Sequence, residues 1–216
     1  MIKRQPNKLL PLCSVLFAAI SHADTVPVSL FEKEGLAAWK QKSFIANTQY
    51  SLVESNGGKA LKAISHASAS GLFKKIRIDL EKTPWLNWSW RIENTLNGPD
   101  ERTKAGDDYP ARVYIIVDGG VFFWSTKVLS FVWSSNQAKG SYWPNAYTKK
   151  TQMIAVQSGT QKLGQWVTEK RNIQVEFQNH FGEHIRYIDA VALMSDTDNT
   201  KQTVTAYYQK LFFSSD

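Results

Sequence analysis

One polar segment of the sequence places two adjacent carboxylates just before an arginine. Asp107 and Asp108 precede Tyr109, and Arg112 stands at the predicted start of a strand. Neighbouring carboxylates at such a junction could bind a cation, or one could act as an acid or base beside the other. The guanidinium of Arg112 could orient a carboxylate through two parallel hydrogen bonds. These four residues are candidate ligand-binding residues. The alternative is structural: an aspartate caps the loop and Arg112 holds it, which is common turn chemistry.

A second acidic segment carries oxygen-bearing side chains at alternate positions. Asp196, Asp198 and Thr200 could supply the first ligands of a calcium-binding loop. The twelve-residue pattern is incomplete, because Lys201 replaces its glycine and Tyr207 replaces its final glutamate. Calcium is therefore the one cofactor that the sequence suggests. A plain turn rich in Asp and Asn between two strands is the alternative.

His180 and His184 match the H-x-x-E-H spacing of one group of zinc peptidases. That motif requires a continuous helix, so that both imidazoles project from one face, whereas Gly182 falls between them at a predicted helix end. A zinc site is therefore not expected. The sequence also lacks a Gly-x-Ser-x-Gly elbow, so no nucleophile and base are recognisable.

The chain is rich in tryptophan, with eight in 216 residues, and a core of this size cannot bury them all completely. In a secreted sandwich, exposed aromatic side chains often form flat platforms for the apolar C–H faces of sugar rings. Trp143 and Tyr147, in a connection rich in Gly, Asn and Pro, are the best candidates and join the candidate ligand-binding residues. Trp88 and Trp90 share one face of a predicted strand, which indicates that they belong to the core.

The pattern around these residues is that of β-strands bounded by turn residues. Strands are predicted at residues 50–54, 59–65, 76–80, 85–93, 112–118, 128–133, 152–157, 185–194 and 203–213. Asn56-Gly57 predicts a hairpin turn, and residues 94–109 form a long polar loop. Apolar residues recur every four positions in residues 172–182, which predicts one short helix ending at Gly182. About ten strands and one helix, without βαβ alternation, predict an all-β, jelly-roll-like β-sandwich.

Residues 1–23 have the three-part pattern of a secretory signal peptide. A basic start is followed by an apolar run at residues 9–20 and by a small-residue cleavage site ending at Ala23. The run is too short to span a bilayer of ~30 Å. We expect cleavage after Ala23, leaving residues 24–216 as a single β-sandwich domain that is periplasmic or secreted. A retained membrane anchor is the alternative.

Composition narrows the choice of partners. The one cysteine, Cys13, lies in the predicted signal peptide, so the mature chain has no disulfide, thiol nucleophile or cysteine metal site. Removing Lys3, Arg4 and Lys8 takes the 26 basic residues to 23 against 19 acidic ones, and the net charge from +7 to +4. This mild excess suits weak attraction to anionic glycans or lipid headgroups. It argues against nucleic acid for an exported chain. We expect no transmembrane segment in the mature chain.

An ordered set of motifs resembles the bacterial family catalogued as domain of unknown function 3047. It begins with LNWSWRI at residues 86–92 and TKAGDDYPARVY at residues 103–114, and it closes with DTDNT at residues 196–200. Between these lie matches at residues 131–133, 157–159, 166, 171–172 and 181–182. The resemblance covers roughly residues 30–213 and implies one exported β-sandwich domain with no established activity. The acidic pair, Arg112 and the DTDNT turn belong to the family pattern, whereas His180 and His184 do not.

Three functions fit these observations. The favoured one is a non-catalytic β-sandwich that binds a carbohydrate or another component of the cell envelope, because tryptophan is abundant and no nucleophile with a base is recognisable. A calcium-stabilised structural envelope protein is the first alternative. A glycan-cleaving enzyme that uses carboxylates is the second, and it would require two carboxyls about 5 to 10 Å apart across a groove.

Overall fold

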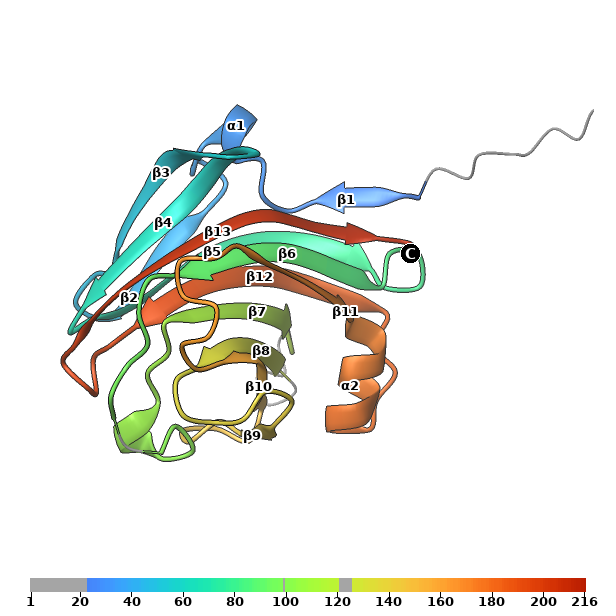
Figure 1. Ribbon diagram of the computed structural model, residues 1–216. Coiled ribbons are helices and arrows are strands. Elements are labelled where there is room, and N and C mark those ends of the chain that lie inside the picture. Colours follow the sequence, from blue (N-terminus) through green and yellow to red (C-terminus); the bar gives the residue numbers. More distant parts are fainter. Residues whose placement is uncertain (1–22, 99, 121–125) are drawn as a thin grey trace, which may run out of the picture.

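The computed structural model describes residues 23–98, 100–120 and 126–216 (Figure 1). The predicted signal peptide, residues 1–23, lies outside these ranges except for Ala23. Within them, 13 strands form two sheets that pack face to face as a jelly-roll-like β-sandwich, which confirms the predicted fold class. In the described ranges no helix has both the length and the apolar character needed to cross a membrane.

Six strands form sheet A, in the order β11-β6-β13-β4-β3, with β1 also paired to β13. They are β1 (Thr25–Pro27), β3 (Gln49–Ser55), β4 (Gly58–His66), β6 (Trp85–Ile92), β11 (Val167–Asn172) and β13 (Thr203–Ser214). Seven strands form sheet B, in the order β2-β5-β12-β7-β8-β10-β9. They are β2 (Lys40–Ile45), β5 (Ala69–Asp79), β7 (Ala111–Val117), β8 (Lys127–Ser134), β9 (Tyr142–Pro144), β10 (Thr151–Ser158) and β12 (Tyr187–Asp196). β8 and β10 run parallel, and the other described pairs are antiparallel.

Strand alternation builds the core between the sheets. Trp88 and Trp90 of β6 are completely buried and meet Phe131 and Trp133 of β8, with ring centroids 5.4 Å (Trp88–Phe131) and 5.8 Å (Trp90–Trp133) apart. Each pair joins a strand of sheet A to a strand of sheet B. The period-two pattern of residues 85–93 therefore predicted the buried face of β6 correctly. Trp124, one of the eight tryptophans, lies outside the described residues.

The predicted helix is present as α2 (Ile173–Phe181), which lies beside β11 (Figure 1). Asn172 caps its first turn, since the side-chain oxygen accepts a hydrogen bond from the backbone N–H of Val175 at 3.1 Å. Gly182 ends it in the left-handed conformation, with φ of 71° and its N–H bonded to the carbonyl of Gln178. Two smaller helical turns, α1 (Phe31–Glu34) and the 3₁₀ turn η1 (Lys104–Gly106), were not predicted.

The predicted strands are confirmed, but the expected number of about ten is too low. Four strands were missed, namely β1, β2, β9 and β11. Each pairs with only one neighbour in the described residues. Strands with one neighbour contact less of the hydrophobic core, so their sequences show little of the alternation of apolar and polar residues that predicts a strand.

Candidate functional site

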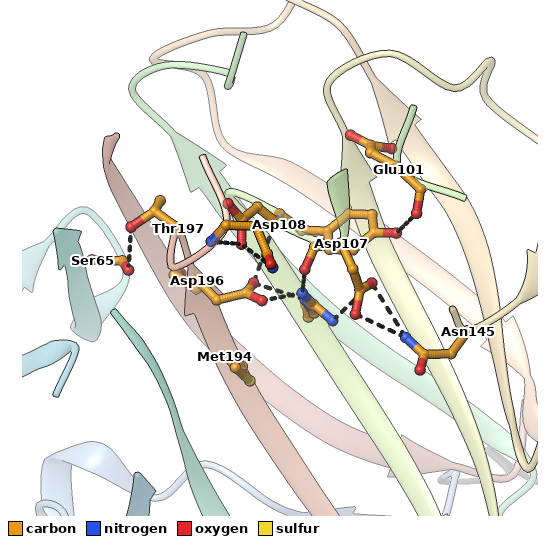
Figure 2. Close-up of polar contacts among 12 residues, drawn as sticks. Ser65, Glu101, Asp107, Asp108, Asn145, Met194, Asp196 and Thr197 are labelled. Atoms are coloured by element: carbon orange, nitrogen blue, oxygen red, sulfur yellow. Dashed lines mark hydrogen bonds and ion pairs between the residues drawn. The ribbon is translucent and has the colours of Figure 1, made fainter. Parts of the chain in front are cut away.

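The acidic segments that the sequence singled out meet around one buried arginine. Arg112 points from β7 to the outer face of sheet B, the face turned away from sheet A, and is 3% exposed. Its Nε donates to Asp196 Oδ1 at 2.8 Å, and its Nη2 contacts Asp196 Oδ2, so the pair is bidentate. Nη2 also donates to the carbonyl of Asp107 at 2.7 Å, and Nη1 to the hydroxyl of Tyr114 at 3.0 Å. Figure 2 shows the labelled Asp107, Asp108 and Asp196 gathered in this cluster.

Asp196 reaches this arginine because β12 and β7 pair with Met194 opposite Arg112. Its Oδ1 also accepts the backbone N–H of Tyr109 at 3.1 Å. Burial raises the pKa of Asp196, and the guanidinium of Arg112 opposes that shift. Burial lowers the pKa of Arg112 and Asp196 raises it, with a net upward shift. The pair is therefore a desolvated ion pair in which each charge depends on the other.

Asp107 and Asp108 hold two different segments of the chain. Asp108, 1% exposed, accepts the backbone N–H groups of Asn199 at 3.2 Å and Thr200 at 2.6 Å. The carboxylate of Asp107 accepts hydrogen bonds from Nδ2 of Asn145 at 3.0 and 3.2 Å, and its Oδ1 lies 3.7 Å from Nη1 of Arg112. The polar loop before β7 is thus tied to the turn after β12 and to the connection after β9. These contacts are the ones expected if the acidic pair has a structural role, with each aspartate holding a loop in place.

Glu101 belongs to the same loop and is 2% exposed, although no motif in the sequence points to it. Its carboxylate contacts the hydroxyl of Ser134 and accepts the backbone N–H of Ser135 at 2.6 Å. Burial raises the pKa of Glu101 to about 7, against the lowering effect of these hydrogen bonds. Its only signal in the sequence is an acidic residue in a long polar loop, which is too common to be informative.

Three carboxylates could together hold a cation. Asp108, Asp196 and Asp198 each place a ligand oxygen within 4.8 Å of the others. Asp196 and Asp198 were predicted as metal ligands, and the predicted Thr200 donates its backbone N–H to Asp108. The oxygens of Asp196 and Asp108 already accept donors of the protein, so a cation would compete with those hydrogen bonds. Burial and the neighbouring Asp108 raise the pKa of Asp198.

The predicted aromatic platform is not formed as a pair. Trp143 is 4% exposed and packs in a small apolar cluster with Tyr109 and Met153, so the expectation that it is exposed is wrong. β9 adds to the edge of sheet B with Trp143 opposite Met153, and this pairing brings the indole under the polar loop. Tyr147 is 59% exposed, and its hydroxyl donates to the carbonyl of Lys104 at 3.3 Å. Tyr109 is completely buried under the guanidinium of Arg112.

The two histidines of the zinc-like motif point to different partners. Nε2 of His180, on α2, lies 3.2 Å from Oε2 of Glu176 one turn earlier. His184 follows the helix, and its Nε2 lies 2.9 Å from the side-chain nitrogen of Gln174. Gly182 ends the helix between them, as the sequence indicated.

A groove of about 770 Å³ lies on the outer face of sheet B. Phe73, Lys75 and Arg77 line it from β5, because the residues alternating with them face the core. Lys75 lies opposite Ala190 of β12, which in turn lies opposite Ile116 of β7. The small side chain of Ala190 between two larger neighbours makes the low floor of the groove. The pairing registers of strands that are far apart in the sequence create this site, so no local motif predicted it.

Charged and aromatic side chains form the rim of the groove. The ring of Tyr187 lies 4.2 Å from the guanidinium carbon of Arg77 and 5.0 Å from that of Arg186, measured to the ring centroid. Asp189 receives hydrogen bonds from Nη1 of Arg77 at 2.9 Å and from the backbone N–H of Asp118 at 3.0 Å. These contacts fix donors and acceptors beside an apolar floor while leaving the side chain of Arg77 66% exposed. Such a combination is typical of small-ligand sites.

Comparison with protein families identifies the chain. Residues 37–212 match the family described as protein of unknown function (DUF3047). The chain belongs to this family. The resemblance seen in the ordered motifs is thereby confirmed, and the buried arginine with its acidic partners lies within the DUF3047 region. No curated protein matches the chain.

Several solved structures resemble the DUF3047 chain remotely. The family 11 carbohydrate-binding module from Clostridium thermocellum, in complex with a β-1,3-1,4-mixed-linked tetrasaccharide, has a TM-score of 0.45 and 12% identity over 89% of this chain and 96% of the module. The endoglucanase Cel12A from Rhodothermus marinus has a TM-score of 0.46 and 10% identity over 89% and 96%. The xyloglucanase domain of NopAA from Sinorhizobium fredii, in complex with cellobiose, has a TM-score of 0.45 and 9% identity over 91% and 100%.

Proposed function

We propose that this protein binds a carbohydrate in the groove on the outer face of sheet B and does so without catalysis. The observation that carries the proposal is the groove itself, about 770 Å³ in volume, with an apolar floor and a charged rim. A sugar ring has apolar C–H faces and a periphery of hydroxyls, so it needs both kinds of surface.

The floor and the rim have the chemistry that such a ligand requires. Phe73, Ala190 and Ile116 offer partly exposed apolar surface along neighbouring strands. Arg77 and Asp189 stand at the edge as a fixed donor and a fixed acceptor for hydroxyls. Because both side chains are held by partners within the protein, little side-chain entropy remains to be lost on binding.

The arrangement of the acids supports binding without cleavage. Glycoside hydrolysis needs two carboxyls on opposite sides of the scissile bond. In the described lining of the groove, Asp118 and Asp189 lie on the same side, since the backbone N–H of Asp118 donates to Asp189. Two further acids, Asp196 and Asp198, do lie near Asp108, but that cluster is occupied by Arg112 and by backbone donors. We assign it the structural role of joining the loops.

We further propose that the protein is exported and acts in the periplasm or outside the cell. The support is the amino-terminal pattern of residues 1–23, with its basic start, short apolar run and small residues before Asp24. Mass spectrometry of the protein recovered from a periplasmic fraction would test this. A mature chain beginning at Asp24 is expected, and an intact amino terminus in the cytoplasmic fraction would contradict export.

The binding proposal is tested by isothermal titration calorimetry of residues 24–216 against a panel of neutral and acidic polysaccharides. Ala190→Phe fills the floor of the groove and is expected to abolish binding. Ser51→Phe is the matched control, because it adds the same ring at an exposed position on sheet A. Failure of the wild-type protein to bind any polysaccharide would refute the proposal. Equal binding by Ala190→Phe and wild type would place the binding site elsewhere and refute the assignment of the groove.

A further inference from the structure

Basic side chains follow one line across β2 and β5, next to the floor of the groove. Lys40 lies opposite Phe73 in the β2–β5 pair. Lys42 follows Lys40 by two residues on β2. Lys75 and Arg77 follow Phe73 by two and four residues on β5, which runs in the opposite direction, so they extend the line beyond Lys40 on the other side. At about 3.4 Å per residue, successive charges stand about 7 Å apart and the line is about 20 Å long. The groove thus has a positively charged margin that is extended in one dimension.

Most of this charge has no ion-pair partner among the residues that the structure describes. Arg77 is paired with Asp189 at 2.9 Å. Lys40, Lys42 and Lys75, here named the lysine line, are exposed and form none of the ion pairs found among the described residues. Three like charges in a row repel one another, and a ligand with matching negative charges relieves that repulsion.

Aromatic side chains are interleaved with the lysine line. Phe44, 56% exposed, has the ammonium of Lys42 at 5.2 Å from its ring centroid. Phe73 is half-buried in the floor, and Tyr187 carries the guanidinium of Arg77 over its ring at the other end. A ligand on this line therefore meets alternating positive charge and apolar surface, and a polymer of charged sugars presents both.

We propose that the groove and the lysine line bind a linear acidic polysaccharide, with its carboxylates on the lysines and its sugar faces on the aromatic side chains. This inference rests on the proposed carbohydrate-binding function and specifies its ligand class. Asp118 and Asp189 on the rim favour such a polymer over DNA, because their carboxylates can accept hydrogen bonds from the free hydroxyls of the sugar rings, which DNA lacks within its chain. Three unpaired lysines also provide fewer contacts than the six to ten phosphate contacts, roughly, of a strong nucleic-acid interface.

The experiment compares two polymers that share a backbone and differ in charge. Polygalacturonate and its methyl ester have the same backbone, and the ester lacks the carboxylates. Binding to residues 24–216 is measured by calorimetry between 20 and 200 mM salt, with single-stranded DNA as a polyanion without sugar carboxylates. The test variant is Lys40→Gln/Lys42→Gln/Lys75→Gln. The control is Lys162→Gln/Lys170→Gln/Lys210→Gln, which removes three exposed lysines that do not line the groove.

We expect polygalacturonate to bind at least about tenfold more tightly than its ester, with a slope of log affinity against log salt of roughly −2, as for three charge contacts on a single-stranded polyanion. The test variant should lose about tenfold in affinity and most of the slope, and the control should keep both. Equal binding of acid and ester would overturn this inference and leave the proposed function standing. Binding of neither, together with no binding across the wider panel, would overturn both. Equal binding of DNA, or loss in the control variant alone, would also overturn the inference.

Discussion

Replacing Arg112 by methionine tests whether the buried arginine organises the loops of this fold. Methionine keeps an unbranched side chain of similar reach and removes the charge. Asp196 would then stay buried beside Asp107 without a cation, and the carbonyl of Asp107 and hydroxyl of Tyr114 would each lose a donor. Burial already raises the pKa of Asp196, so the variant should take up a proton there.

The size of the effect follows from the burial of the pair. Arg112 and Asp196 are 3% and 2% exposed, so the surface value for an ion pair does not apply. Removing one partner of a buried pair costs about 3 to 5 kcal/mol, because the remaining charge is left uncompensated. For a chain of this size each kcal/mol lowers Tm by roughly 2 to 4 °C, so we expect a fall of about 6 to 20 °C.

Urea unfolding followed by tryptophan fluorescence measures this cost. Arg102→Met is the control, because it removes an exposed arginine from the same loop and should change the free energy of unfolding by less than about 0.5 kcal/mol. Asp196→Asn and the double variant complete a thermodynamic cycle, in which the double should be at least about 2 kcal/mol more stable than the sum of the singles predicts. Strictly additive losses, or a loss below about 1 kcal/mol for Arg112→Met, would refute the reasoning.

Three further predictions concern single side chains. Because burial raises the pKa of Glu101 to about 7, its protonated form stabilises the fold at low pH; this stability is fully present below about pH 4.5 and is lost as pH rises through about 7. The free energy of unfolding from urea titrations should therefore fall between pH 5 and pH 8 by up to about 3 kcal/mol, and Glu101→Gln should flatten this pH profile; identical profiles for the two proteins would contradict this. Asn172→Ala removes the N-terminal cap of α2 and should lower the free energy of unfolding, measured by thermal melting, by about 1 kcal/mol. The control Asn179→Ala, at an exposed position of the same helix, should lower it much less, and equal losses of stability in the two variants would exclude capping. Calcium binding stays a prediction. In the presence of chelator, Asp198→Asn should raise the free energy of unfolding by about 0.5 kcal/mol, because it removes repulsion between like charges. A rise in the Tm of the wild-type protein with calcium that Asp198→Asn lacks would instead establish a metal site.

Local patterns predicted the elements whose physics is local. The Asn56-Gly57 turn, the buried face of β6 and the C-terminal cap of α2 at Gly182 each depend on residues within a few positions. The missed strands β2 and β11 have sequences KQKSFI and VTEKRN, in which few residues face the core. Because each pairs with a single neighbour, backbone hydrogen bonds rather than apolar side chains hold it in the sheet.

The candidate site depended on registers that the sequence does not state. Both acidic segments were recognised, but Arg112 and Asp196 are 84 positions apart and meet only through the pairing of β7 with β12. The burial of Trp143 likewise required the pairing of β9 with β10. The groove floor at Ala190 has no signal of its own, since an alanine becomes a depression only when the neighbouring strands bring larger side chains to its sides.

The position of β13 in sheet A has a consequence for the order in which the chain can fold. β13 follows every other strand of the described residues, yet it pairs with β6 on one side and with β4 and then β1 on the other. Until residues 203–214 are available, β4 and β6 each have an edge without its final partner. Sheet A therefore cannot form strand by strand during synthesis. Until β13 pairs with them, its earlier strands keep unpaired edges, which are prone to aggregation.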